Sequence, residues 1–243
     1  MGQEAIELTL TTSDFDTEHL HIHRLRAKER MNHCYSVELE VIAVGGAAPS
    51  IDEVGGANVT ATLSRAGEVL RAFHGVVIRA TERHGRDDGH LGLTLTLAPR
   101  LWLATLVETL DIHIGKSIPT LIEEKLELLD MHPDGEFVAS LLSTYPLRQM
   151  IVQYRETDLA FLSRWCEHYG IFFFFVQSAS DTQLVFGDNV GAYRPIADVA
   201  EVQFVTTGDL DGVFELAAEQ QLIPGYFLCR DYNDQMPATE LQA

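Results

Sequence analysis

The stretch QYRETDLAFLSRWCEHYGI occupies residues 153–171, and the apolar run FFFFV follows it at 172–176. Apolar side chains recur at helical spacing within this stretch, at Leu159, Leu162, Cys166 and Tyr169. That stripe predicts an amphipathic helix, which Thr157 or Asp158 can cap and which Gly170 can end in a left-handed conformation. The apolar run predicts a buried strand directly after the helix.

The residues before this unit are typical of β-strands. Apolar and polar side chains alternate with period two in four segments: 6–10, 37–41, 59–62 and 91–97. Glycine-containing turn signals separate them, and the one at 85–89 predicts a long hairpin between 76–78 and 91–97. About six strands at this spacing predict a small barrel or sandwich.

The middle of the chain differs from both ends. Ser117 can cap a helix that has Pro119 in its first turn, whereas apolar strand signals return at 202–205 and 226–229. This order predicts a mainly β fold in which a β-barrel is interrupted by a smaller α/β module. We expect three regions: a discontinuous barrel of residues 1–108 plus 199–236, an inserted α+β domain of residues 109–198, and the start of a further region at 237–243.

Composition excludes several functional classes. The chain has 17 Lys and Arg against 36 Asp and Glu, a net charge of −19. Such a charge disfavours nucleic acid and anionic membranes as partners, and no apolar run approaches the ~20 residues that span a bilayer. Three cysteines far apart in the sequence indicate reduced thiols in a cytoplasm.

The candidate catalytic and metal-binding residues are few. His19, His21 and His23 would share one face of a strand and could hold a metal ion, although they could equally cover a solvent-exposed face. Cys166 could act as a nucleophile, but its place on an apolar helical stripe favours a core residue. We therefore expect no catalytic site and no cofactor, with a metal-dependent hydrolase using the three histidines as the alternative.

The 153–171 segment resembles the VgrG spike proteins of type VI secretion systems, whose head domain is shared with the hub of contractile phage baseplates. The residues that match the family pattern are Gln153, Tyr154, Glu156, Asp158, Phe161, Arg164, Glu167, Gly170 and Ile171. The chain has Thr157 where Ser is usual, Trp165 where Leu is usual and Phe172 where Tyr is usual. Segments 73–77 and 97–103 resemble further family elements, as do Asp231, Tyr232 and Pro237.

The resemblance implies a structural function. It predicts a homotrimeric head that caps the Hcp tube and supports a membrane-puncturing needle for effector delivery. Its expected partners are a second and third copy, Hcp, and baseplate, effector or adaptor proteins, without nucleic acid and without membrane contact by this segment. The motif residues are then structural, and a phage tail baseplate hub is the alternative within the same fold.

The resemblance also implies a location and a larger context. We expect the protein in the bacterial cytoplasm before firing, and outside the cell or in the target cell after contraction. Family members continue into more of the head, a neck and a needle, so we expect this chain to be part of a longer protein or a short relative. It should form weak trimers or none by itself, which light scattering at micromolar concentration would test.

Overall fold

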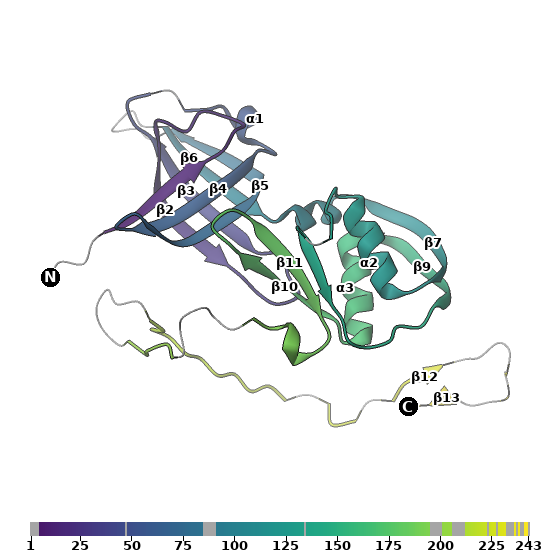
Figure 1. Cartoon of the computed structure of the whole chain (residues 1–243). Helices are drawn as coiled ribbons and strands as arrows, with labels where there is room; N and C mark the ends of the chain where they lie inside the picture. Colours follow the sequence, from purple (N-terminus) through teal and green to yellow (C-terminus); the bar gives the residue numbers. More distant parts are fainter. Residues whose placement is uncertain are drawn as a thin grey trace. The chain divides into compact units, whose positions relative to one another are not determined.

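A computed structural model describes residues 5–46, 48–84, 91–133, 135–194, 201–205, 212–222, 224–226, 228–231, 236, 238 and 241–242. The chain divides into two compact units, Met1–Arg194 and Pro195–Ala243. Figure 1 shows that the first unit holds a strongly curved sheet, formed by the N-terminal strands, and a smaller module of helices and strands.

The N-terminal strands form one six-stranded sheet. Its members are β1 (Ile6–Thr11), β2 (Leu20–Lys28), β3 (Ser36–Ala43), β4 (Asn58–Arg65), β5 (Glu68–His84) and β6 (Leu91–Ala98), in the order β1-β4-β5-β6-β3-β2. The two edge strands, β1 and β2, lie next to each other, so the sheet curls into a barrel (Figure 1). A short helix, α1 (Ile51–Val54), precedes β4 and is capped by Ser50.

Alternate apolar side chains of the strands fill the inside of the barrel. Cross-strand partners on β3 and β6 point inward and are almost fully buried: Val37 with Leu97, Leu39 with Leu95, and Val41 with Leu93. Residues between them, such as Glu38 and Thr96, lie on the other face. The predicted strands at 6–10, 37–41, 59–62 and 91–97 are confirmed, as is the antiparallel β5–β6 pair.

Gly75 explains why one family element contains glycine. A Cβ built on Gly75, in β5, would lie 2.7 Å from the backbone oxygen of Ala98 in β6. Because backbone cannot move aside cheaply, we expect Gly75→Ala to lower the free energy of unfolding by about 1–3 kcal/mol. Urea denaturation would measure this loss. Gly135→Ala is the matched control, since nothing lies within 4 Å of its added Cβ; equal losses in both variants would contradict the steric explanation.

The second part of the first unit begins with a 3-10 helix, η1 (Arg100–Thr105), directly after β6. The elements that follow are β7 (Glu108–Lys116), α2 (Ile118–Glu127), β8 (Phe137–Ser140), β9 (Arg148–Thr157), α3 (Asp158–Tyr169), β10 (Phe172–Gln177), β11 (Thr182–Gly187) and η2 (Val190–Ala192). We call this region, residues 100–194, the module. β7 and β9 form an antiparallel two-stranded sheet, while β10, β11 and β8 form a second sheet. The two helices pack between them (Figure 1).

Local sequence signals place both helices. The Ser117 hydroxyl accepts the backbone N–H of Thr120 and the Thr157 hydroxyl accepts that of Ala160, so each helix begins at a capped residue. Gly170 ends α3 with φ of +69°, a conformation that costs glycine little. The predicted caps and the strand after α3 are confirmed, although within that strand only Phe173 is buried and the other residues are half-buried. The strand pairs in antiparallel register with β11. No described helix is both long and apolar enough to cross a membrane.

The module contacts the barrel at a second place besides the covalent link after β6. Asn32, in the turn between β2 and β3, donates its backbone N–H to the carbonyl of Phe173 at 2.9 Å. The Asn32 side-chain oxygen accepts the backbone N–H of Phe173 at 2.8 Å. This pair of hydrogen bonds joins the turn to β10.

The second unit contains short elements in its described part. β12 (Arg230–Asp231) pairs with β13 (Leu241–Gln242), and Phe204 forms an isolated bridge with Val213. The expected strands at 202–205 and 226–229 are wrong for the described residues, because a strand needs a ladder of backbone partners and these apolar runs have at most one bridge. The expected return of residues 199–236 to the barrel stays a prediction.

Candidate functional site

Most of the predicted motif residues come together where β9 passes into α3. Gln153 is fully buried on the inner face of β9, and its amide nitrogen donates to Asp158 Oδ1 at 2.8 Å and to the carbonyl of Glu156 at 3.1 Å. Lys125 of α2 donates to the same Asp158 oxygen at 2.7 Å. These three side chains are called the buried polar cluster below.

The cluster links α2, α3 and β9 through a buried charge, the ammonium of Lys125. Lys125 is 5% exposed, and its ammonium lies 5.8 Å from the centre of the Phe161 ring. A buried ammonium is stable only when a carboxylate or other acceptors compensate it, and Asp158 supplies that carboxylate. The cluster therefore fixes α2 against α3 and the end of β9.

Arg164 and Glu156 hold the outside of the same corner. The guanidinium donates to both carboxylate oxygens, at 2.5 and 3.2 Å, and to the carbonyl of Val152 at 3.3 Å. A bidentate pair of this kind fixes orientation as well as distance.

Arg155 forms the bend at this corner. It has φ of +47° and is the extra residue of a β-bulge, because Thr109 pairs with Glu156 while Leu110 pairs with Tyr154. Arg155 is not among the residues that match the family pattern, so the bend depends on the backbone there and on the partners of its neighbours.

The structure separates the remaining motif residues. Phe161 lies in the core of the module, and Gly170 ends α3. Tyr154 points to the opposite side of β9 from Gln153 and is 63% exposed. Asp231 lies in β12, whereas Tyr232 and Pro237 are outside the described residues.

His113 is a site residue that sequence reasoning missed. It lies on the inner face of β7, 7% exposed, with its ring 5.4 Å from that of Phe161. Burial lowers its pKa below the ordinary value of 6.5; Asp111 opposes this effect, while Lys125 and Lys116 add to it. Alternation would have placed it wrongly, because the apolar residues of β7, Leu110, Ile112 and Ile114, are the exposed ones. Only the pairing with the buried Ile151 shows that His113 faces inward.

The lowered pKa predicts acid sensitivity. The unfolded chain binds a proton at His113 below pH 6.5 and the folded chain resists it, so stability is full above that pH and falls as pH decreases below it. One such group contributes at most about 1.4 kcal/mol per pH unit. We expect the drop in urea midpoint between pH 7.5 and 5.5 to be smaller in His113→Phe than in the native protein; an equal drop would assign the effect to other groups.

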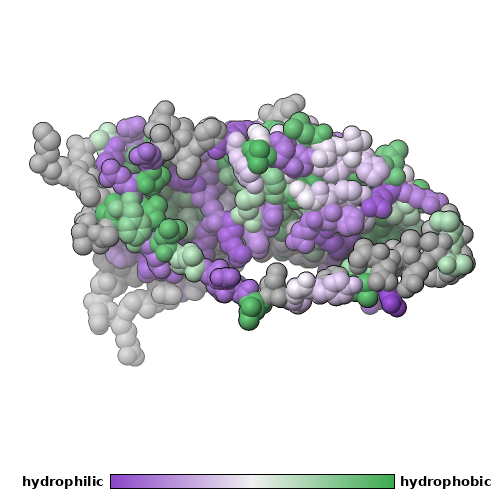
Figure 2. All heavy atoms as spheres, turned by 90° about the horizontal axis from the view of Figure 1, so that it is seen from below, coloured by the Kyte–Doolittle hydropathy of each residue, from purple (hydrophilic) through white to green (hydrophobic). Residues whose placement is uncertain are grey.

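The opposite side of the β7–β9 sheet is apolar and exposed. Three cross-strand pairs form this outer face: Leu110 with Tyr154, Ile112 with Val152, and Ile114 with Met150. In Figure 1 these strands lie on the side of α2 and α3 away from the barrel. Figure 2 shows that hydrophobic patches also interrupt the hydrophilic cover on the face seen from below. Contiguous apolar surface of this kind is typical of interaction sites.

The three N-terminal histidines do not form one row. His19 precedes β2 and its ring lies against Gly46, and a register irregularity between Ile22 and Arg24 falls at His23. Within the part of the chain that the structure describes, no group of three or more His, Cys, Asp or Glu side chains could hold a metal ion. Cys166 is buried, and burial raises the pKa of its thiol to about 12, which is typical of a core cysteine.

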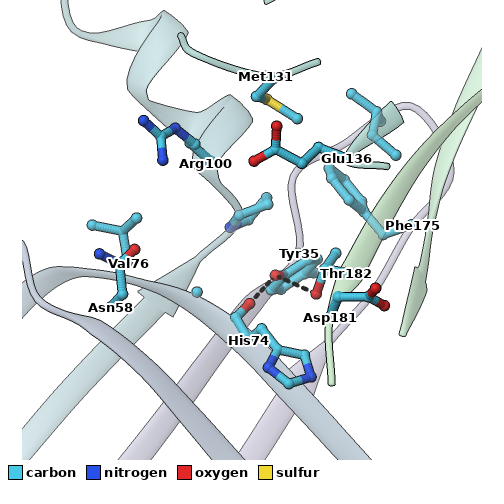
Figure 3. A pocket seen from close by; sticks show the side chains of 13 residues that line it. Tyr35, Asn58, His74, Val76, Arg100, Met131, Glu136, Phe175, Asp181 and Thr182 are labelled. Carbon is cyan, nitrogen blue, oxygen red and sulfur yellow. Dashed lines mark hydrogen bonds between the residues drawn. The ribbon is translucent and has the colours of Figure 1, made fainter. Parts of the chain in front are cut away.

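A cavity of about 210 Å³ lies where the barrel meets the module (Figure 3). Tyr35 donates its hydroxyl to the carbonyl of His74 there, and the His74 ring is within hydrogen-bond distance of Thr60 and of the carbonyl of Ser178. Arg100 donates to the carbonyl of Leu129 at 2.5 Å. The cavity is smaller than typical ligand sites of 300–1,000 Å³, and these polar groups already bind protein, so we interpret it as part of the barrel–module contact.

Comparisons with known proteins point to one family. The family profile described as phage tail baseplate hub (GPD) matches residues 28–243. The type VI secretion system spike proteins VgrG1c and VgrG1a of Pseudomonas aeruginosa are 29% and 28% identical over 95% and 91% of this chain, and the matches cover 32% and 34% of their lengths. The chain thus spans about a third of these curated relatives.

A solved structure has the same fold. The Escherichia coli c3393 protein is described as a component of the type VI secretion system with structural similarity to the T4 bacteriophage tail proteins gp27 and gp5. It aligns with 72% of this chain and 50% of its own, with a TM-score of 0.63 and 24% identity.

Proposed function

Since the chain belongs to the phage tail baseplate hub (GPD) family, we propose that it is the head of a type VI secretion spike, a structural subunit that acts by assembly and not by catalysis. The observation that carries this proposal is the similarity to the VgrG1c and VgrG1a spike proteins, which extends over 95% and 91% of the chain. The fold supports it, because the six N-terminal strands curl into a barrel of the kind that the proposed ring requires.

The proposed domain organisation follows the family order. Residues 1–108 and 199–236 would build one barrel of the tube-capping ring, residues 109–198 would form the inserted domain, and residues 237–243 would begin the next region. Three copies would form the ring, which would cap the Hcp tube, support the needle, and contact baseplate and effector or adaptor proteins. The head would be in the cytoplasm before firing and would leave the cell on contraction.

Binding to tube ends tests this proposal. We expect a form of the protein long enough to trimerise to co-sediment with preformed Hcp tubes and, in negative-stain micrographs, to lie at their ends. Lateral binding along the tube, or no binding to tubes, would overturn the tube-capping proposal. A phage tail hub remains the second candidate because the matching profile describes that protein, and tail genes beside the coding gene would favour it.

A further inference from the structure

Few side chains hold the β7–β9 sheet against α2 and α3, which it covers (Figure 1). Within residues 108–116 and 148–157, all of which the structure describes, only three side chains are buried: His113, Ile151 and Gln153. Two of the three are polar, so burial of apolar surface contributes little to the attachment of the sheet. A two-stranded sheet is at best marginally stable by itself in water. The order of this sheet therefore depends largely on the three side chains that face the helices.

His113 is the side chain of this set that can gain a proton. Its ring lies 5.4 Å from the ring of Phe161 on α3, and its Nε2 forms no hydrogen bond with a described residue. The buried ammonium of Lys125 lies 5.8 Å from the same Phe161 ring. A proton on His113 would leave a charged N–H without an acceptor in hydrogen-bond range, and it would add a second positive charge to a core that already holds Lys125.

The carboxylates around His113 compensate this second charge only in part. The charged groups that act on the ring are Asp111 and Lys116 of β7 and Glu124 and Lys125 of α2. Burial lowers the pKa of His113 most, and the two lysines lower it further, whereas the two acids raise it. Asp111 Oδ2 lies 3.7 Å from Nε2, but its side chain is half exposed. Asp158 of α3 already accepts hydrogen bonds from Lys125 and Gln153.

We propose that His113 is a pH-sensitive switch: its uncharged ring holds the β7–β9 sheet on α2 and α3 at neutral pH, and its protonation in mild acid releases the sheet while the barrel stays folded. Release exposes the imidazolium to water, which the attached sheet prevents. It also uncovers side chains of the helices, including Phe161, that are buried at neutral pH. The switch depends on residues of the module alone, so it does not rest on the proposed spike function.

Hydrogen exchange followed by mass spectrometry tests the switch in the native chain. Exchange is measured at pH 7.5 and at pH 5.0 and corrected for the intrinsic effect of pH on the exchange rate. We expect protection of residues 108–116 and 148–157 to fall, by at most about tenfold for each pH unit below 6.5. Protection of the barrel strands β3 and β6 should change by less than about twofold. Unchanged protection of the sheet, or an equal loss in the barrel, would overturn the inference.

Two variants at partly exposed positions separate an effect of charge from an effect of packing. Asp111→Asn removes a carboxylate that favours the imidazolium, so the loss of protection should begin at lower pH. Lys116→Met removes a cation that opposes the imidazolium and frees Glu124 from its ion pair, so the loss should begin at higher pH. Both variants should fold, because neither side chain is buried. If the two variants did not shift the response in opposite directions, the role of His113 would be structural only and the inference would be wrong.

Removing the imidazole tests the identity of the switch. His113→Phe keeps an aromatic ring beside Phe161 but cannot be protonated, so its sheet should have equal protection at both pH values. His21→Phe, at an exposed histidine of β2, is the matched control and should keep the full acid response. A full acid response in His113→Phe would assign the effect to another group and overturn the inference. If this variant did not fold, the opposite shifts of the Asp111 and Lys116 variants would still decide the question.

Discussion

Replacing Asp158 with alanine is expected to lower the free energy of unfolding by about 3–5 kcal/mol. The variant leaves the Lys125 ammonium buried without its carboxylate, and it removes one of the two acceptors of the Gln153 amide, the one 2.8 Å away. Breaking the pair costs more than the pair itself contributes, because the remaining Lys125 side chain is 6% exposed and its ammonium has little access to solvent. Urea denaturation at pH 7, followed by circular dichroism, measures the loss.

Two further variants separate this cause from a general effect of the substitution. Asp158→Asn combined with Lys125→Met removes both charges and keeps an acceptor for Gln153, so most of the lost stability should return. Glu123→Ala, at an exposed position of α2, should stay within about 0.5 kcal/mol of the native protein. If Asp158→Ala lost less than about 1 kcal/mol, Lys125 would have another source of compensation, and the role assigned to the cluster would be wrong.

Replacing Phe161 with alanine is expected to cost a similar amount, about 3–5 kcal/mol. Its ring is fully buried in the module core, beside the ring of His113 and below the charged groups of Lys125 and Arg164. The variant would lose the apolar transfer energy of the ring and leave a cavity that the fixed helices cannot close.

The same urea measurement tests the Phe161 variant. Leu128→Ala, at a 73% exposed leucine directly after α2, is the control and should change stability by less than about 0.5 kcal/mol. Because Phe161 contacts Lys125, its effect should not add to that of Asp158→Ala. A strictly additive double variant would show that the ring and the ion pair stabilise the module independently.

Local signals in the sequence predict much of the fold. Alternation at 37–41 and 91–97 identifies the inward side of the barrel strands, and Thr157 and Gly170 identify both ends of α3. These features depend on residues within a few positions of one another, where the spacing along the chain determines which side chains share a face.

The candidate site was less predictable because its parts meet across long distances in the chain. The Asp158 motif was visible, but its partner Lys125 lies 33 residues earlier and is an ordinary helical lysine by sequence. Likewise, the apolar face requires that Leu110 lie opposite Tyr154, which only the β7–β9 register establishes. The strand expected at 202–205 was wrong because an apolar run predicts a strand locally but carries no information about whether a pairing partner is present.

The two hydrogen bonds between Asn32 and Phe173 have a mechanical consequence. A domain attached by one linker can rotate about that linker. A second anchor at Phe173, 73 residues after η1 leaves the barrel at Arg100, resists that rotation. A lateral force on the module is then transmitted to the barrel as torque, so the module and the barrel move together.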